Sequence, residues 1–142
     1  MIRSNQLGRP SPRELSRKLQ SAKELVALGR WSPAHPAKLQ VNFDELEGLG
    51  IEVALPEEQA AIFEAVLREI RPGDYVGQRP PEKSYEPGAW EQELFPFRWQ
   101  STCCGNCAMY FKFSIARAGE NEKWLFVFSL HPSRVALGAA GG

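Results

Sequence analysis

The sequence lacks the features of a membrane protein, a secreted protein or a protein that coats nucleic acid. No apolar run approaches the roughly 20 residues of a membrane-spanning helix, and the polar start MIRSNQLGRPSPREL has no apolar signal-peptide stretch. Lys+Arg and Asp+Glu both number 17, so the net charge is zero. Zero net charge argues against electrostatic coating of nucleic acid but is compatible with a local basic site. We expect a cytoplasmic protein without a membrane partner.

Cysteine is scarce and clustered, with Cys103, Cys104 and Cys107 lying within five residues. An odd, clustered set is not a disulfide framework. The spacing from Cys104 to Cys107 is that of half a zinc knuckle, but a structural zinc site needs four ligands, and beyond this pair only Cys103, His35 and His131 remain. We predict reduced cysteines in a turn, no metal and no cofactor; a small metal-binding protein is the alternative.

The length and composition are those of one globular domain. The chain has 142 residues, of which 43% are hydrophobic and 24% charged, enough to bury a core without disulfides. We predict a single domain over residues 1–142. Within it, we expect a mobile arm at 1–11, a folded core at 12–134 and a flexible tail at 135–142, where the sequence is VALGAAGG.

Two helices are predicted in the first half of the chain. Ser11 is a suitable N-cap, with Pro at the first helical position and Glu14 at the third, and apolar residues then recur at helical spacing over 12–28. Pro56, followed by two acids, begins a second helix that Pro72 ends.

The segments around the second helix are less regular. We expect a proline-rich connection over 31–38, a short strand over 39–43 because apolar and polar residues alternate there, and a helical turn over 44–49. Residues 71–93 hold several prolines and glycines among many charges. A loop of this length in a compact domain is usually functional or disordered.

Aromatic and β-branched runs dominate the second half. They cover 94–100, 108–115 and 124–131, and the joints between them contain Gly or Asn. This pattern predicts a three-stranded antiparallel meander. The expected fold class is therefore α+β, with N-terminal helices packed on a C-terminal antiparallel sheet.

Alternation assigns the two faces of this sheet, because successive strand residues point to opposite sides. The apolar face is expected to hold Phe95, Phe97, Trp99, Met109, Phe111, Phe113, Ile115, Trp124, Phe126, Phe128 and Leu130. The opposite face is expected to hold Leu94, Pro96, Arg98, Gln100, Tyr110, Lys112, Ser114, Leu125, Val127, Ser129 and His131. The first face must be buried against the helices.

The second face gathers two cations, a phenol and an imidazole, with no acid among its strand residues. Such a set can bind a phosphodiester and stabilise its developing charge, and the imidazole of His131 can move a proton near neutral pH. The stiff loop that carries Arg79 and Lys83 is expected to close over this face, and Arg134 follows the last strand. The alternative is an ordinary solvated outer face.

Four stretches of the chain resemble the motility quorum-sensing regulator (MqsR) toxins, a family of mRNA interferases with a RelE-like fold. They are LSRKLQSAKELVALG at 15–29, NFDELEGL at 42–49, AWEQELF at 89–95, and AMYFKF at 108–113 followed by VFSLH at 127–131. The resemblance implies metal-independent cleavage of mRNA and neutralisation by a cognate antitoxin protein. The loop over 71–93 is longer, and the net charge less basic, than the family pattern.

The resemblance also implies roles for individual residues. Tyr110 matches the family's sheet tyrosine, Gln92 falls near its glutamine after the tryptophan, and Lys83 stands for its loop lysine. His131 falls where the family has a lysine, which adds a group that can shuttle a proton near pH 7.

The expected reaction is attack of a ribose 2′-hydroxyl on the adjacent phosphate. Lys112, Arg98 and Lys83 are expected to hold the phosphate, with Arg79 and Arg134 adding to substrate binding. His131 is expected to act as base or acid, and Tyr110 to orient the phosphate or stack on a base. The alternative is a non-enzymatic interaction or regulatory module that uses the same face.

Overall fold

The computed structural model of the protein describes residues 10–78, 81–118 and 122–134. The expected tail at 135–142, and residues 1–9 of the expected arm, lie outside the described residues. Arg79 lies outside them as well.

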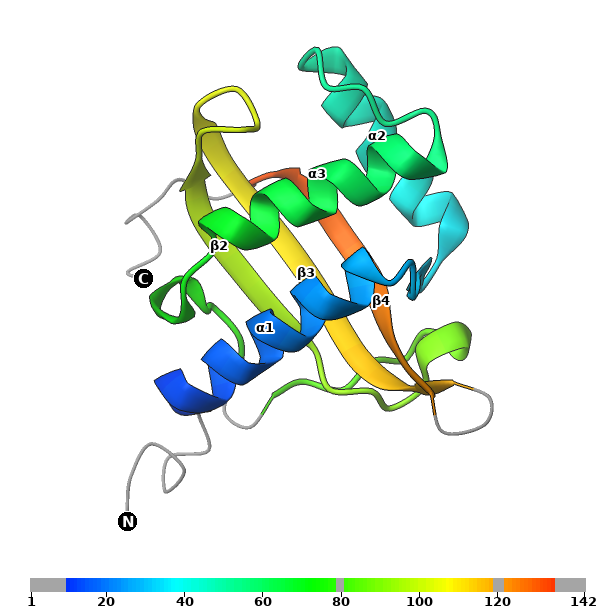
Figure 1. Ribbon diagram of the computed structural model, residues 1–142, viewed down its shortest axis with the longest axis vertical. Helices are drawn as coiled ribbons and strands as arrows, with labels where there is room; N and C mark the ends of the chain where they lie inside the picture. Colours follow the sequence, from blue (N-terminus) through cyan, green and yellow to red (C-terminus); the bar gives the residue numbers. More distant parts are fainter. Residues whose placement is uncertain (1–9, 79–80, 119–121, 135–142) are drawn as a thin grey trace.

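All three α-helices of the described chain and the short strand β1 lie in its first half, and the other three strands of the sheet lie in its second half. The elements are, in order, α1 (Pro12–Ala27), β1 (Trp31–Pro33), α2 (Pro36–Gly48), α3 (Pro56–Glu69), the 3-10 turns η2 (Pro72–Asp74) and η3 (Pro87–Ala89), β2 (Phe95–Ser101), β3 (Cys107–Ala118) and β4 (Glu122–Pro132). The strand order is β1-β4-β3-β2, with β2, β3 and β4 antiparallel and β1 parallel to β4. Figure 1 shows α1 and α3 side by side across one face of the sheet. The predicted α+β class is confirmed.

Local capping explains why α1 and α3 begin where the sequence predicts. The Ser11 hydroxyl accepts from the Glu14 backbone N–H at 3.1 Å, and the Glu14 carboxylate accepts from the Ser11 N–H at 2.8 Å. Pro occupies the first turn of both helices, and acids lie in the first turn of α3. No helix in the described ranges is both long and apolar enough to cross a membrane.

The predicted strand over 39–43 is wrong, because these residues belong to α2. Pro36 stands in the first turn of this helix, and the His35 ring nitrogen Nδ1 accepts from the Lys38 backbone N–H at 3.2 Å, which caps it. The buried positions of α2 are Leu39, Asn42, Phe43 and Leu46. Their spacing is helical, and a five-residue alternation is too short to distinguish a strand from this pattern.

The connection expected over 31–38 is also partly wrong, because Trp31–Pro33 forms β1 and pairs in parallel with β4. Sequence patterns of three residues carry too little periodicity to predict such a strand. The Trp31 ring packs edge-on against Phe63 of α3, with ring centroids 4.9 Å apart. This contact ties the short strand to the helical layer.

A β-bulge in β4 changes which side chains enter the core. Phe113 pairs with Val127 and Lys112 pairs with Ser129, so Phe128 has no partner on β3. The extra residue shifts the alternation by one position. The inward residues of β4 are Leu125, Val127 and Leu130, all fully buried.

The predicted faces of β4 are therefore correct after the bulge and wrong before it. Leu125 and Val127 lie in the core rather than on the polar face, whereas Trp124, Phe126 and Phe128, which the alternation predicts on the buried face, are only partly buried. Leu130 is buried as expected. On β2 and β3 the prediction is confirmed: Phe97, Phe111, Phe113 and Met109 have no exposed surface.

Helix α2 supplies a hydrogen-bond acceptor to the backbone of β4 just beyond the bulge. The side-chain oxygen Oδ1 of Asn42 accepts from the Leu130 backbone N–H at 2.9 Å, and Asn42 is only 8% exposed. β1 pairs with β4 at Leu125, Phe126 and Val127, so it does not extend to this position. The Asn42 amide thus replaces a strand neighbour at the end of β4 that carries His131.

Glu69, at the end of α3, anchors the turn between β2 and β3. Its carboxylate accepts from the Trp99 ring N–H, the Ser101 hydroxyl and the backbone N–H groups of Thr102 and Cys103, at 2.6 to 2.9 Å. Burial raises the pKa of Glu69, but the hydrogen bonds outweigh it and lower the pKa to about 2. The carboxylate is therefore ionised at neutral pH and holds the sheet against the helices.

We predict that Asn42→Ala destabilises the protein by about 1 to 3 kcal/mol, because a buried N–H of Leu130 loses its acceptor. Chemical denaturation and amide hydrogen exchange at Leu130 measure the effect. Gln40→Ala, an exposed change on the same helix, is the matched control and should stay within about 0.5 kcal/mol of the wild type. Equal stabilities of the two variants would contradict the proposed role of Asn42.

Candidate functional site

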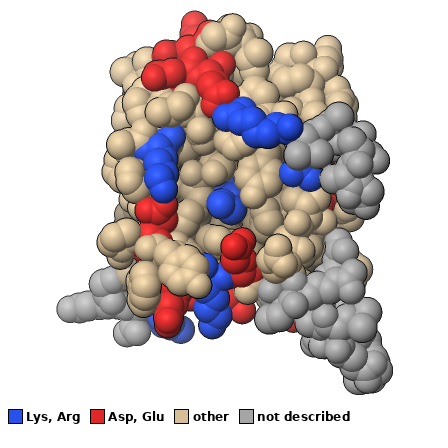
Figure 2. Space-filling view, turned by 180° about the vertical axis from the view of Figure 1, so that it is seen from behind, with Lys and Arg blue, Asp and Glu red and all other residues tan. Residues whose placement is uncertain are grey.

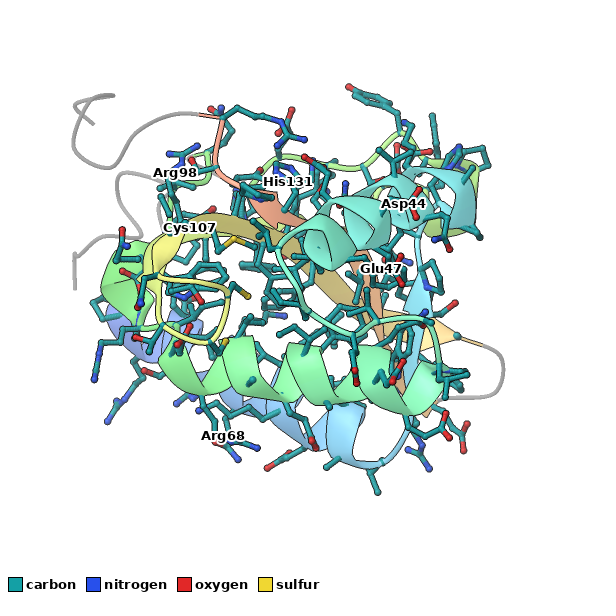
Figure 3. The ribbon with its side chains drawn as sticks, turned by 90° about the horizontal axis from the view of Figure 1, so that it is seen from above. Asp44, Glu47, Arg68, Arg98, Cys107 and His131 are labelled. Atoms are coloured by element: carbon teal, nitrogen blue, oxygen red, sulfur yellow. The ribbon has the colours of Figure 1, made fainter. Side chains whose placement is uncertain are left out.

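Three polar side chains form a row across the outer face of the sheet. Arg98 pairs with Tyr110, and Tyr110 pairs with His131, so the three lie in register on β2, β3 and β4. The Tyr110 and His131 rings stack with centroids 5.3 Å apart and an interplanar angle of 29°. The Arg98 guanidinium lies over the Tyr110 ring at 5.6 Å. In Figure 3, Arg98 and His131 lie on the side of the sheet turned away from α1 and α3.

The His131 ring has a defined tautomer when it is neutral. Its Nδ1 lies 2.7 Å from the Pro132 carbonyl oxygen, and since a carbonyl only accepts, Nδ1 must donate. The lone pair of the neutral ring is therefore on Nε2. This arrangement leaves Nε2 as the atom that can accept a proton.

Burial lowers the pKa of His131, and the charges of Arg134 and Lys112 lower it further; the Pro132 hydrogen bond and Glu45 act in the opposite direction. The two cations named lie on neighbouring parts of the same face: Lys112 is on β3, and Arg134 follows the end of β4.

Tyr110 keeps its phenolic proton at neutral pH. Burial raises its pKa, the positive charge of Arg98 lowers it, and the carboxylate of Glu82 raises it, with a net rise. A protonated phenol can donate a hydrogen bond to a phosphate oxygen. Tyr110 therefore suits orientation rather than proton abstraction.

A groove opens beside this row, between the loop over 82–86, β3 and β4. Its volume is about 410 Å³. The lining residues are Lys38, Glu82, Lys83, Ser84, Tyr85, Glu86, Leu94, Lys112 and Phe128. The bulged residue Phe128 forms part of its wall, and the Lys112 Nζ lies 5.8 Å from the Phe128 ring centroid.

The loop thus borders the outer face, as expected from its sequence, and Lys83 and Lys112 line the same groove. Gln92 has a different position: its side-chain oxygen accepts a hydrogen bond from the Ser114 hydroxyl of β3. This bond fastens the loop to the sheet, so Gln92 is a positioning residue in the observed arrangement.

Acids from outside the strands accompany the cations of this face, whose predicted strand residues include no acid. Arg134 donates to the Glu45 carboxylate at 3.0 Å, and Lys38 donates to the Glu86 carboxylate at 2.6 Å. Figure 2 shows Lys/Arg and Asp/Glu interspersed over this side of the molecule. The groove lining therefore carries three lysines, Lys38, Lys83 and Lys112, and two acids, Glu82 and Glu86.

Sequence reasoning missed Lys38 as a groove residue, because it lies in a segment that the pattern predicts to be an irregular connection. The helical spacing of α2 and its Pro36 start were the available signals.

The Arg98 side chain is held in place by a hydrogen bond, since its Nε donates to the Ser133 hydroxyl at 2.9 Å.

The cysteines lie away from this row, in the turn region between β2 and β3. The three cysteines are free, as predicted; the sulfur atoms of Cys103 and Cys104 lie 3.9 Å apart, and Cys104 is fully buried in the core although it lies in the turn. Burial raises the pKa of both thiols, that of Cys104 to about 12. In the described part of the chain, no group of three or more His, Cys, Asp or Glu residues is placed to hold a metal ion.

Comparisons of this chain with protein-family models, with curated proteins and with solved structures found no match.

We predict that His131 titrates below the ordinary histidine value of about 6.5, and that Arg134→Gln raises its pKa by removing a charge that disfavours the imidazolium. An NMR titration of the imidazole protons measures both, and the only other histidine is His35. Arg68→Gln, on the far side of the sheet (Figure 3), should leave the titration unchanged. A His131 pKa at or above 6.5 would contradict the prediction, because it would show that other interactions offset the effect of burial on this pKa.

Proposed function

We propose that the protein is a metal-independent endoribonuclease of the toxin type, with a RelE-like fold, that cleaves mRNA in the cytoplasm and is neutralised by an antitoxin protein. The observation that carries the proposal is His131, whose Nε2 holds a lone pair beside Tyr110 on an outer sheet face. The resemblance to the motility quorum-sensing regulator toxins supports the same activity. The groove beside the row, whose lining holds three lysines and two glutamates, supports an anionic substrate.

In the proposed reaction, His131 Nε2 takes the proton of a ribose 2′-hydroxyl as the oxygen attacks the adjacent phosphorus. The new 2′-oxygen–phosphorus bond replaces the bond from phosphorus to the 5′-oxygen. The protonated imidazole then returns a proton to the departing 5′-oxygen, which leaves a cyclic 2′,3′-phosphate and a 5′-hydroxyl. Lys112 and the Tyr110 hydroxyl stabilise the charge that develops on the phosphate oxygens.

Three further residues support the site. Arg98 is held by Ser133 and covers the Tyr110 ring, so it keeps the phenol in place and lends positive charge to the row. Lys83 lines the groove from the loop. Arg134 acts on the pKa of His131 and is itself paired with Glu45.

We predict that purified protein cleaves single-stranded RNA in excess chelator, because the proposed chemistry uses an imidazole and fixed cations in place of a metal ion. Gel analysis of a labelled RNA oligonucleotide measures cleavage, and the same sequence in DNA is the control that lacks the attacking hydroxyl. Activity that disappears with chelator and returns with a divalent ion would contradict the metal-free mechanism.

We predict that His131→Ala lowers kcat by about 10²- to 10⁴-fold, the usual effect of losing one acid–base group. His131→Lys should retain more activity than His131→Ala, because it supplies a positive charge at the rim of the row, where the family resemblance implies a lysine. Lys123→Ala, an exposed change at the other end of β4, is the matched control.

The melting temperature of each variant is measured alongside its kinetics, so that loss of fold is separated from loss of chemistry. Wild-type cleavage rates in folded His131→Ala would reject the proposed mechanism. In that case the outer face would serve the alternative function of a binding module.

A further inference from the structure

Two aromatic side chains stand exposed on the loop that borders the groove. Tyr85 is 78% exposed and Trp90 is 59% exposed. Their rings contact each other edge to face, with centroids 5.8 Å apart and an interplanar angle of 66°. Exposed aromatic rings of this size leave apolar area in water, which is unfavourable unless a partner covers it.

The segment that carries the pair is held in a defined conformation. The Ser84 N–H donates to the Gln92 carbonyl at 2.9 Å, the Glu91 N–H donates to the Ser84 carbonyl at 2.8 Å, and the Leu94 N–H donates to the Glu82 carbonyl at 2.8 Å. These bonds close the segment into a narrow hairpin.

Contacts with two other elements keep this hairpin in place. Lys38 of α2 pairs with Glu86, and Gln92 is bonded to Ser114 of β3. At the tip, a Cβ at Gly88 would lie 3.1 Å from the Ala34 carbonyl oxygen, so the tip packs directly against the connection between β1 and α2. The two rings are therefore presented by a preorganised loop, which lowers the entropy that a ligand must spend on ordering them.

The pair is continuous with the groove and its lysines. Tyr85 lines the groove together with three lysines, Lys38, Lys83 and Lys112, and two acids, Glu82 and Glu86, and Trp90 contacts Tyr85. Aromatic rings beside lysines are a combination that binds single-stranded nucleic acid, since the cations contact the phosphates while unpaired bases stack on the rings. A duplex offers no free base face to such a ring.

We propose that Tyr85 and Trp90 form a stacking site for an unpaired base of the RNA strand, next to the phosphate held at Lys112. The inference rests on the proposed ribonuclease function and assigns it a single-stranded substrate. The site confers affinity for unpaired nucleotides irrespective of their identity, because every base has a face that can stack.

The test measures binding of a fluorescein-labelled 2′-O-methyl RNA strand by anisotropy. This strand lacks the attacking hydroxyl, so the proposed reaction cannot cleave it. Tyr85→Ala and Trp90→Ala should each weaken binding by about 5- to 100-fold, the range that one base–aromatic stack supplies. Tyr85→Phe and Trp90→Phe keep a ring and should bind within about threefold of the wild type.

Two comparisons separate stacking from other effects. The labelled strand annealed to its complement should bind the Ala variants and the wild type equally, because its bases are already stacked. Leu28→Ala removes an exposed apolar side chain, 65% exposed, at the end of α1 and should leave binding unchanged.

The stacking site is overturned if the Ala variants bind the single strand like the wild type, if the wild type does not bind it, or if the pair is needed only to bind a protein. Its failure is distinguishable from failure of the proposed function. A wild type that cleaves RNA although the Ala variants bind normally rejects the stacking site alone. A wild type that binds through the rings but cleaves no RNA rejects the ribonuclease function and leaves a single-strand binding site.

Discussion

The one-residue bulge in β4 is the constraint on which both faces of the sheet depend. Leu125 and Val127 point into the core, and strict alternation from them would bury His131 as well. The unpaired Phe128 shifts the alternation, so that Leu130 fills the core and His131 emerges beside Tyr110. The bulge therefore determines both which side chains of β4 fill the core and which belong to the candidate site.

The chemistry of the outer face follows from partial burial beside fixed charges. His131 is half-buried, so burial and the cations near it disfavour its protonation, while its Nδ1 is occupied by the Pro132 carbonyl. Tyr110 is kept in its protonated form by the same burial. The neutral chain places three lysines and two glutamates in the lining of one groove, a local distribution that zero net charge conceals.

The loop after α3 contributes to the site because tertiary bonds hold it there. Its proline and glycine content alone is equally compatible with a disordered linker. Bonds from Gln92 to Ser114 and from Lys38 to Glu86 connect it to β3 and α2. These contacts join segments far apart in the sequence, so no local pattern predicts them.

The sequence by itself determined the α+β class, the limits of α1 and α3, and the inward faces of β2 and β3, because capping residues and period-two alternation act locally. Only the tertiary structure decided that Leu39–Phe43 is helical, that Trp31–Pro33 adds a strand, and that β4 changes parity. Each depends on a partner distant in the chain: α2 packs beside β4, Asn42 accepts from Leu130, and β1 needs the edge of β4. Burial against such partners overrides short local patterns, because the free energy of a packed core exceeds that of local propensity.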